Sequence, residues 1–116
     1  MIEKGMVKRA MIAVVSGIPI GNVTHYGSVA EIVSGMVGKH IWAQVIWWML
    51  SALWEKEQQI VPWQRVVNKQ WYISSIKLGD RWRRQKLLLE QEGILVNGLW
   101  VDMEQYAFKA DAVQKK

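Results

Sequence analysis

The sequence of 116 residues contains no cysteine. This absence excludes disulfide bonds, catalysis by a thiolate and every zinc site that uses cysteine ligands. Only two histidines are present, His25 and His40, and their spacing does not suit a helical metal pair. The sequence also has no Ser–His–Asp arrangement and no glycine-rich loop that would hold a phosphate. It therefore predicts no catalytic residue, no metal site and no cofactor.

Long hydrophobic runs are missing as well. The longest apolar stretch, 41–54, is about 14 residues long, which is too short to span a bilayer. Residues 7–30 have some features of a signal peptide, but Gly17 and Pro19 interrupt the apolar part and a helical pattern explains it better. We therefore expect a cytoplasmic, nucleoid-associated protein.

The chain has the size of one domain, 1–116, and its hydrophobic content of 51% is that of a folded protein. Its net charge is +5, with a pI near 9.6. This balance is compatible with nucleic-acid binding and equally with an ordinary solvated face. The basic residues are concentrated between Trp63 and Lys86, and Asp80 is the one acidic residue there. The basic residues of this stretch are Arg65, Lys69, Lys77, Arg81, Arg83, Arg84 and Lys86.

Helical periodicity predicts three helices in the N-terminal half. The first covers 2–16 and is amphipathic. Ser28 and Glu31 have the spacing of a capping box, which predicts a short helix over 28–34. A third helix, apolar nearly all round, is expected over 39–54. The last two are separated by a glycine-containing turn and form a candidate helix-turn-helix.

The C-terminal half predicts a strand, a basic helix and a hairpin. An extended segment is expected over 71–76 and a helix over 81–92, capped by Gly79-Asp80 before it and ended by Gly93. Within 94–101, Asn97-Gly98 is typical of a tight hairpin turn. The predicted fold is therefore mainly α with a small β hairpin, as in a winged helix-turn-helix domain.

The segment 62–68, with the sequence PWQRVVN, is the most informative stretch. Proline restricts the backbone and Asn tolerates turn geometry, so the segment predicts a rigid, partly buried loop. Such a loop presents the aromatic face of Trp63 and the guanidinium of Arg65 to a planar ligand. It supplies no nucleophile. Alternatively, Arg65 makes a structural ion pair.

Three separated motifs resemble those of the O6-alkylguanine-DNA alkyltransferases. IPIGNVTHYGSVA at 18–30 resembles the family segment IPxGxVxxYGxIA, and RQKLLLEQEGI at 84–94 resembles the helix motif that follows the active site. PWQRVVN looks like the active-site motif PCHRVxxxxG with Trp63 in place of cysteine. That replacement is characteristic of the alkyltransferase-like proteins, and the resemblance covers about residues 6–108.

The resemblance implies a DNA-damage sensor that is not an enzyme. Alkyltransferase-like proteins bind alkylated guanine without repairing it, through a helix-turn-helix in the minor groove and a base flipped into a pocket. The implied partners are double-stranded DNA containing alkylated guanine and the proteins of nucleotide excision repair. The implied lesion pocket consists of Tyr26, Trp63, Arg65, Asn68 and Ser74, with Trp63 lining the pocket and Arg65 and Asn68 holding the loop. The implied DNA-binding residues are Thr24, Tyr26, Gln44, Trp47, Trp48, Lys69, Arg81 and Arg84.

The chain departs from the family pattern at several positions. In the second helix of the motif, an arginine that fills the gap left by the flipped base is Gln44 here, and a glycine is Trp47. A tryptophan at this position predicts a steric block where the DNA backbone approaches. Gln64 replaces the more usual neighbour of the active-site residue, and Trp71 falls where the family commonly has glycine.

A second hypothesis is a diverged or engineered scaffold that keeps the fold and has lost DNA recognition. It would form a homodimer through its tryptophan-rich second helix, because exposed apolar surface marks interaction sites. Trp47 and Trp48 fit either core contacts or such a surface. Packing in the core is the prediction for Trp42, Trp54, Trp82 and Trp100. A Trp63 sealed in the interior with no hollow beside it would argue against the lesion pocket.

Overall fold

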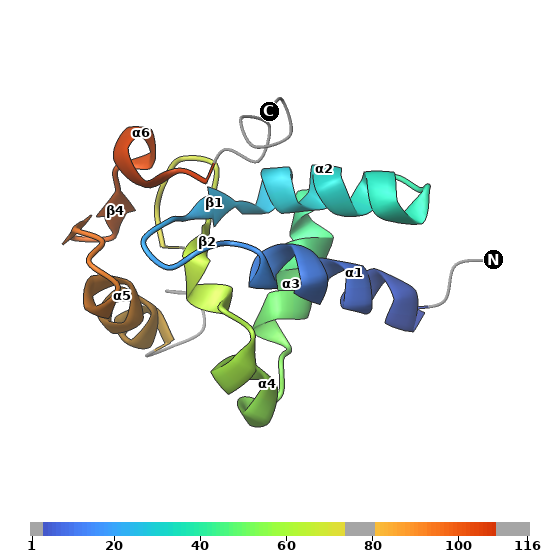
Figure 1. The fold of residues 1–116 in the computed structure, drawn as a ribbon, viewed down its shortest axis with the longest axis horizontal. Coiled ribbons are helices and arrows are strands. Elements are labelled where there is room, and N and C mark those ends of the chain that lie inside the picture. Colours follow the sequence, from blue (N-terminus) through green and yellow to red (C-terminus); the bar gives the residue numbers. More distant parts are fainter. Residues whose placement is uncertain (1–3, 74–80, 109–116) are drawn as a thin grey trace.

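The computed structural model describes residues 4–73 and 81–108 (Figure 1). None of the described helices has the length and apolar character needed to cross a bilayer. The elements are α1 Lys4–Ser16, β1 Thr24–His25, α2 Tyr26–Val37, α3 Ala43–Ser51, α4 Glu55–Ile60, the 3₁₀ helix η1 Trp63–Arg65, β2 Val66–Val67, α5 Arg81–Gln91, β3 Val96–Asn97, β4 Trp100–Val101 and α6 Met103–Tyr106. This mainly helical fold with a small β component confirms the predicted fold class.

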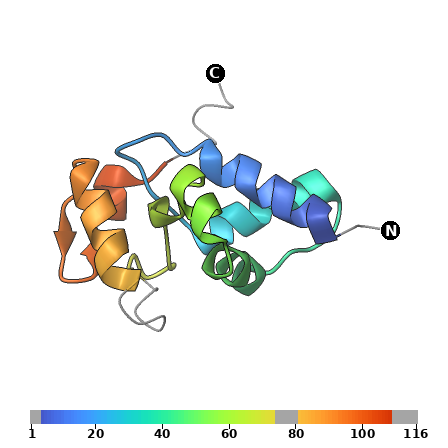
Figure 2. The same cartoon turned by 90° about the horizontal axis from the view of Figure 1, so that it is seen from below.

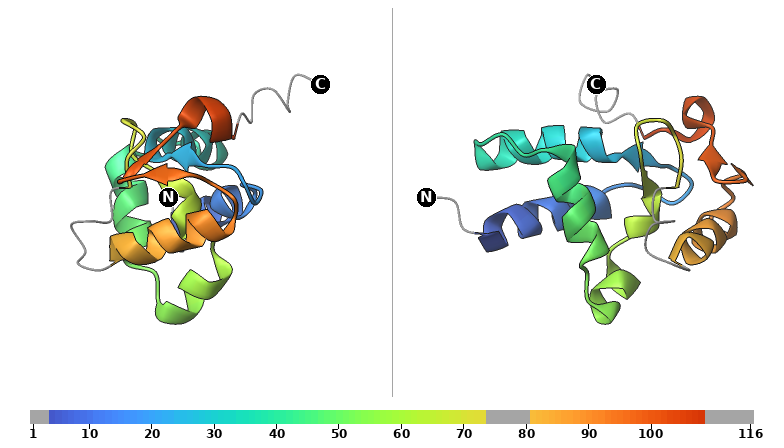
Figure 3. Two further views of the ribbon diagram at one scale, coloured as in Figure 1. Left: turned by 90° about the vertical axis from the view of Figure 1, so that its left-hand side faces the viewer. Right: turned by 180° about the vertical axis from the view of Figure 1, so that it is seen from behind.

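The first three helices surround one hydrophobic core. Helices α1 and α2 lie side by side, and α3 runs crosswise to them (Figure 3). Helix α2 packs against both α1 and α3, and all three bury an apolar face in this core, which is the reason that short helices are stable here. The core residues from α1, α2 and α3 are Met11, Val15, Val29, Val33, Ile46 and Leu50.

A second, smaller core lies at the other end of the molecule. Here α5 packs beside the hairpin β3–β4 (Figure 2). The side chains in this core are Val23, Val67, Ile73, Leu89, Ile94, Val96, Val101 and Met103. Between the two cores, β1 and β2 form a short parallel pair in which Thr24 is opposite Val66 and His25 is opposite Val67. This pair holds the start of α2 next to the loop that contains Trp63.

Helix α2 differs from its prediction at both ends. It begins at Tyr26, not Ser28, because the His25 ring accepts a hydrogen bond from the Ser28 backbone N–H at 3.2 Å and caps the helix. The helix also continues through Gly35 and ends at Gly38, whose φ of 71° lies in the left-handed region that favours glycine. The capping box at Ser28 is therefore wrong as a prediction.

The helix predicted over 39–54 is shorter at both ends, and a separate helix follows it. Helix α3 starts at Ala43, and the chain turns after Ser51 before α4 begins. At the start of α4, the Trp54 backbone N–H donates to Glu57 Oε1 at 2.9 Å, which satisfies an amide that the helix itself leaves free. Apolar residues run through this break, so periodicity did not reveal it.

The hairpin is present with a turn shifted by one residue. Asn97 pairs with Trp100, so the two central turn residues are Gly98 and Leu99, and not Asn97 and Gly98. Gly98 has a φ of 63°, and glycine at the first central position is favoured in tight hairpins. Gly93, with a φ of 85°, ends α5 as predicted.

The predicted extended segment is confirmed only at Tyr72, which forms an isolated antiparallel bridge with Trp100. Trp71 lies in a bend with a positive φ, although Val101 N–H donates to its carbonyl and Ile73 N–H donates to Leu99 O, both at 2.8 Å. Residues 74–76 and the predicted cap at Gly79-Asp80 lie outside the described residues.

The tryptophans predicted to lie in the core are not all buried. The side chains of Trp42 and Trp54 are 67% and 75% exposed, so both predictions are wrong. Both residues stand just before a helix, outside the face that packs against the core. Trp82 and Trp100 are half-buried. Trp82 packs against the second core, and the Trp100 ring lies against that of Trp71.

Helix α4 is tied to α1 by Glu57. Its carboxylate accepts from Lys8 Nζ at 2.9 Å and from the Trp54 backbone N–H, and the latter bond is the main cause of a lowered Glu57 pKa. Because the pKa of Glu57 is lower in the folded protein than in the unfolded chain, its ionised carboxylate stabilises the fold at pH values above the unfolded-state pKa. This stabilisation is lost as the pH falls through the lower, folded-state pKa.

We expect Glu57→Gln to lower the melting temperature slightly at neutral pH, because the amide lacks the charge that attracts Lys8. The difference from the parent should disappear in acid, where the parent's carboxylate becomes protonated. Thermal melts of both proteins over a pH series measure this. A difference that is the same at every pH would show that the charge is not responsible.

Candidate nucleic-acid interface

Helix α3 presents a polar and aromatic face to solvent. Ile46 and Leu50 are buried in the core, whereas Gln44 is exposed and Trp48 is 53% exposed. Trp47 is half-buried beside them. In a helix-turn-helix, the solvent face of the second helix is the one that meets DNA. The residues predicted to contact DNA from this helix therefore lie on its accessible side.

The turn between α2 and α3 is held by Ser34. Its hydroxyl donates to Ala30 O at 2.7 Å and accepts from the Ile41 backbone N–H at 2.8 Å. The left-handed Gly38 completes the turn. These bonds link the last turn of α2 to the residues that precede α3, and so they help to set the orientation of the exposed face of α3.

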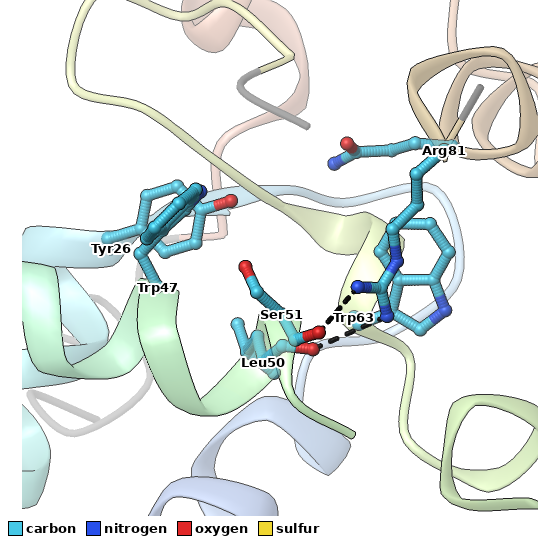
Figure 4. A pocket seen from close by; sticks show the side chains of 7 residues that line it. Tyr26, Trp47, Leu50, Ser51, Trp63 and Arg81 are labelled. Atoms are coloured by element: carbon cyan, nitrogen blue, oxygen red, sulfur yellow. Dashed lines mark hydrogen bonds between the residues drawn. The ribbon is translucent and has the colours of Figure 1, made fainter. Parts of the chain in front are cut away.

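Trp63 lies in the interior. Its side chain is only 5% exposed and belongs to the first core, and its Nε1 has no hydrogen-bond partner. A cavity of about 10 Å³ remains beside it, close to the space needed for one water molecule. The residues that line this inner cavity are Tyr26, Trp47, Leu50, Ser51, Trp63, Arg81 and Gln85 (Figure 4). In this conformation the cavity has no room for a purine.

Arg81 lines the inner cavity next to Trp63. Its guanidinium carbon lies 4.9 Å from the centre of the Trp63 ring, and Nη1 donates to Ser51 O at 2.7 Å (Figure 4). A second, longer bond of 3.5 Å runs to Leu50 O. A cation near the carbonyls at the end of α3 is electrostatically favourable. Burial lowers the pKa of Arg81, but a guanidinium still stays charged at neutral pH.

Gln85 positions the backbone around Trp63. Its side chain is almost fully buried, and Nε2 donates to Gln64 O at 3.1 Å and to Val66 O at 3.0 Å. Both carbonyls belong to the segment that carries Trp63. The loop is therefore held from α5, and the burial predicted for part of it is confirmed at Trp63 and Gln64.

Arg65 makes a structural ion pair with Glu92. Nε and Nη2 of Arg65 donate to the two Glu92 carboxylate oxygens at 2.8 and 3.1 Å, and Nη1 donates to Ile18 O at 2.7 Å. Gln64 Nε2 donates to the same carboxylate at 2.7 Å. Arg65 lines neither the inner cavity nor the outer hollow described below; it holds the loop through the structural ion pair that the sequence left open as the alternative.

Asn68 organises the loop that follows β2. Its Oδ1 accepts from the backbone N–H groups of Gln70 and Tyr72 at 3.0 and 2.9 Å. Between them, Trp71 has a φ of 72°, which a bulky residue rarely adopts. The motif commonly has glycine here, so the positive φ explains that preference. Packing of Trp71 against Trp100, with ring centres 5.9 Å apart, accompanies the strained backbone.

A larger hollow opens outside the inner cavity. Its volume is about 690 Å³, and it lies between the start of α2, the exposed side of α3 and the loop 68–73. Tyr26 and Trp47 line both spaces and so form the wall between them. We call this space the outer hollow. It is lined by His25, Tyr26, Gly27, Ala43, Gln44, Trp47, Asn68, Lys69, Gln70, Tyr72, Ile73 and Leu99.

The remaining predicted site residues are distributed unevenly. Lys69 is exposed at the outer hollow, and Arg84 is exposed on α5. Thr24 is 7% exposed within β1, so its side chain contributes to the fold and not to a DNA-facing surface. Ser74 lies outside the described residues.

Sequence reasoning missed four residues that build the site. His25 caps α2, Tyr72 lines the outer hollow, and Gln85 and Glu92 hold the loop that carries Trp63. The local sign of these contacts in the sequence is Gln85, an uncharged residue in an otherwise basic helix. Gln85 and Glu92 lie 19 to 28 residues away in sequence from the loop residues that they bind. No sequence pattern predicts pairing over such a distance.

The comparisons with known proteins agree with this geometry. Residues 6–94 match the family model of the 6-O-methylguanine DNA methyltransferase DNA binding domain. Two proteins named DNA base-flipping protein, from Escherichia coli (strain K12) and Shigella flexneri, are each 35% identical over 94 residues, which is 80% of this chain and 67% of theirs.

Two solved structures from S. pombe have the same fold. Atl1 in complex with damaged DNA containing O6-carboxymethylguanine has a TM-score of 0.78 and 25% identity, over 93% of this chain and 99% of that chain. ATL in complex with DNA has a TM-score of 0.76 and 26% identity, with the same coverage.

Proposed function

The chain belongs to the family of the 6-O-methylguanine DNA methyltransferase DNA binding domain, and we propose that it recognises guanine alkylated at O6 in duplex DNA without removing the alkyl group. The observation that carries the proposal is Trp63, which occupies the motif position of the alkyl-accepting cysteine. Relatives named for base flipping and for complexes with damaged DNA support it.

Without a cysteine, this chain cannot take the alkyl group from the guanine. An indole carbon or N–H is no substitute for a thiolate nucleophile, so the alkyl group would stay on the base. Recognition is useful only if another process then removes the lesion. We therefore propose that the bound protein flags the site for nucleotide excision repair, and that it acts near the chromosome in the cytoplasm.

The proposed DNA contacts come from α3 and its surroundings. Gln44 and Trp48 lie on the exposed face of α3, and Lys69 is exposed on the neighbouring loop. Gln44 offers hydrogen bonds to a base edge but no charge, so phosphate attraction must come from basic residues elsewhere. Aromatic side chains on a helix in the minor groove can act as wedges between base steps.

The test is a titration of fluorescent duplexes that differ in one base, guanine or O6-methylguanine, at two salt concentrations. We expect tighter binding to the modified duplex and weaker binding of both duplexes at the higher salt concentration, because phosphate contacts release counterions. Fluorescence anisotropy measures both affinities. Equal affinity for the two duplexes would contradict lesion recognition.

Self-association is the second candidate function. It is favoured by the exposure of four large apolar side chains on or next to α3 and α4, because such surface marks interaction sites. Sedimentation of the parent chain without DNA, over a range of concentrations, measures self-association, and the duplex titration measures DNA binding. A concentration-dependent dimer that binds neither duplex would favour the scaffold. The exposed side chains are Trp42, Trp48, Trp54 and Ile60.

A further inference from the structure

Of the two neighbouring tryptophans of α3, Trp48 is the one that projects from the fold. It is 53% exposed and lines neither the inner cavity nor the outer hollow. Among the described residues, its indole has no hydrogen-bond partner and no ring contact. Trp47, by contrast, is half-buried and lines both spaces together with Tyr26 (Figure 4). Trp48 is therefore the indole of this helix that can reach another molecule.

Trp48 shares a helix face with Gln44. The two residues are four apart in α3, so they stand one turn apart on the same side of the helix. Long side chains on a helix point back toward its N-terminus, over the preceding turn. The Trp48 indole can therefore extend toward the position where the motif has an arginine and this chain has Gln44.

An indole suits the gap that a flipped base leaves in the stack. Taking a base out of a duplex costs a few kcal/mol of stacking and pairing, and it uncovers the faces of the neighbouring bases. An aromatic side chain returns about 1–3 kcal/mol for each base on which it stacks. The Gln44 amide can form hydrogen bonds, but it offers much less surface for stacking. Of the two side chains, Trp48 is thus the one that can replace the lost stacking.

An exposed indole on the DNA-facing side of α3 meets a narrow groove. The minor groove of B-DNA is about 6 Å wide. A large ring that stands out from a helix there either keeps the helix away from the bases or enters between base steps as a wedge. A flipped base has already opened such a space, so the wedge no longer has to separate two stacked pairs. Recognition by base flipping therefore favours insertion.

Resting on the proposed function, we propose that Trp48 fills the gap left by the extrahelical guanine, in place of the arginine of the motif. The indole enters from the minor groove and stacks on the base pairs on either side of the gap. A charged side chain that the motif uses for this purpose is thereby replaced by an uncharged aromatic one, one turn further along the same helix. The role of Trp48 is to hold the opened duplex and not to bind the modified base.

The experiment compares Trp48 variants with a matched tryptophan control. Trp48→Ala removes the indole from an exposed position, and Trp48→Phe keeps an aromatic ring there. Trp54→Ala is the control, because Trp54 is 75% exposed and lies beyond the end of α3. Each protein is titrated, at two salt concentrations, with an O6-methylguanine duplex and with a duplex that has an abasic site in place of the modified guanine. Melting curves confirm that each variant is folded.

We expect Trp48→Ala to raise the dissociation constants of both duplexes about tenfold, the effect of losing one base–aromatic stacking contact. The factor should be the same at both salt concentrations, because an indole displaces no counterions from the phosphates. Trp48→Phe should lose less affinity than Trp48→Ala, since a smaller ring still stacks. Trp54→Ala should bind like the parent.

Unchanged or tighter binding by Trp48→Ala would overturn the proposal, and tighter binding would identify the indole as an obstacle to DNA. An equal loss in Trp54→Ala, or a loss that disappears at the higher salt concentration, would also overturn it. Failure of the proposed function is a different result. Equal affinity of the parent for guanine and O6-methylguanine duplexes would refute lesion recognition, and the abasic duplex would still test the stacking of Trp48. A parent that binds no duplex would refute both.

Discussion

Replacing Glu92 by alanine should lower the free energy of unfolding by about 3–5 kcal/mol, the cost of leaving one member of a buried ion pair without its partner. The Arg65 and Glu92 side chains are only 13% and 12% exposed. The substitution also removes the acceptor for Gln64, which is itself buried. Three elements that are distant in sequence, the loop before α2, η1 and the end of α5, would lose their common contact.

Urea denaturation measures the effect, and Glu90→Ala is the matched control. Glu90 is exposed on the same helix and carries the same charge, so its loss should change the free energy of unfolding by less than about 0.5 kcal/mol. The double variant Arg65→Met with Glu92→Ala should recover part of the loss, because it leaves no unpaired charge. Equal stability of the two single glutamate variants would show that the buried pair contributes nothing.

Replacing Trp63 by alanine should destabilise the protein by about 3–5 kcal/mol, the range for removing a large aromatic side chain from a core. The indole packs in the first core, and its ring supports the Arg81 guanidinium. Trp54→Ala is the control, since Trp54 is 75% exposed and its loss leaves no cavity. Thermal and urea denaturation measure both variants. A Trp63→Ala protein as stable as Trp54→Ala would contradict the buried position.

The cavity created by this substitution provides a second readout. An engineered cavity the size of a large side chain can bind a small aromatic molecule. Free indole should therefore raise the melting temperature of Trp63→Ala and leave that of the parent unchanged. Trp63→Phe should be much less destabilising, because it keeps a ring in the core and removes an N–H that has no partner.

Several features of the fold were predictable because their signals are local. Helix α1, the end of α5 at Gly93 and the presence of the hairpin follow from periodicity and from glycine at positions with positive φ. The start of α2 and the end of α3 were not predictable, for different reasons. Helix α2 starts after His25, which is an unusual cap. Helix α3 ends at Ser51, within a run of apolar residues that continues into the next turn.

The residues of the candidate site were also predictable only in part. Motif spacing alone singled out Tyr26 and Trp63, and both line the inner cavity. Motif position did not reveal that Arg81 lines this cavity or that Arg65 faces Glu92. Both arginines had been assigned to DNA or to the lesion pocket, because a cationic side chain has the same pattern in sequence whether it meets a phosphate, a carbonyl or a carboxylate.

By itself, the sequence determined the family, the fold class and the absence of an alkyl-accepting thiol, because each depends on residue identities at fixed spacings. Only the tertiary structure decided which tryptophans are buried and which residues surround Trp63. Burial depends on the neighbours that a fold brings to each side chain. Trp63 and Trp54 therefore look alike in the sequence, yet one lies in the core and the other lies in solvent.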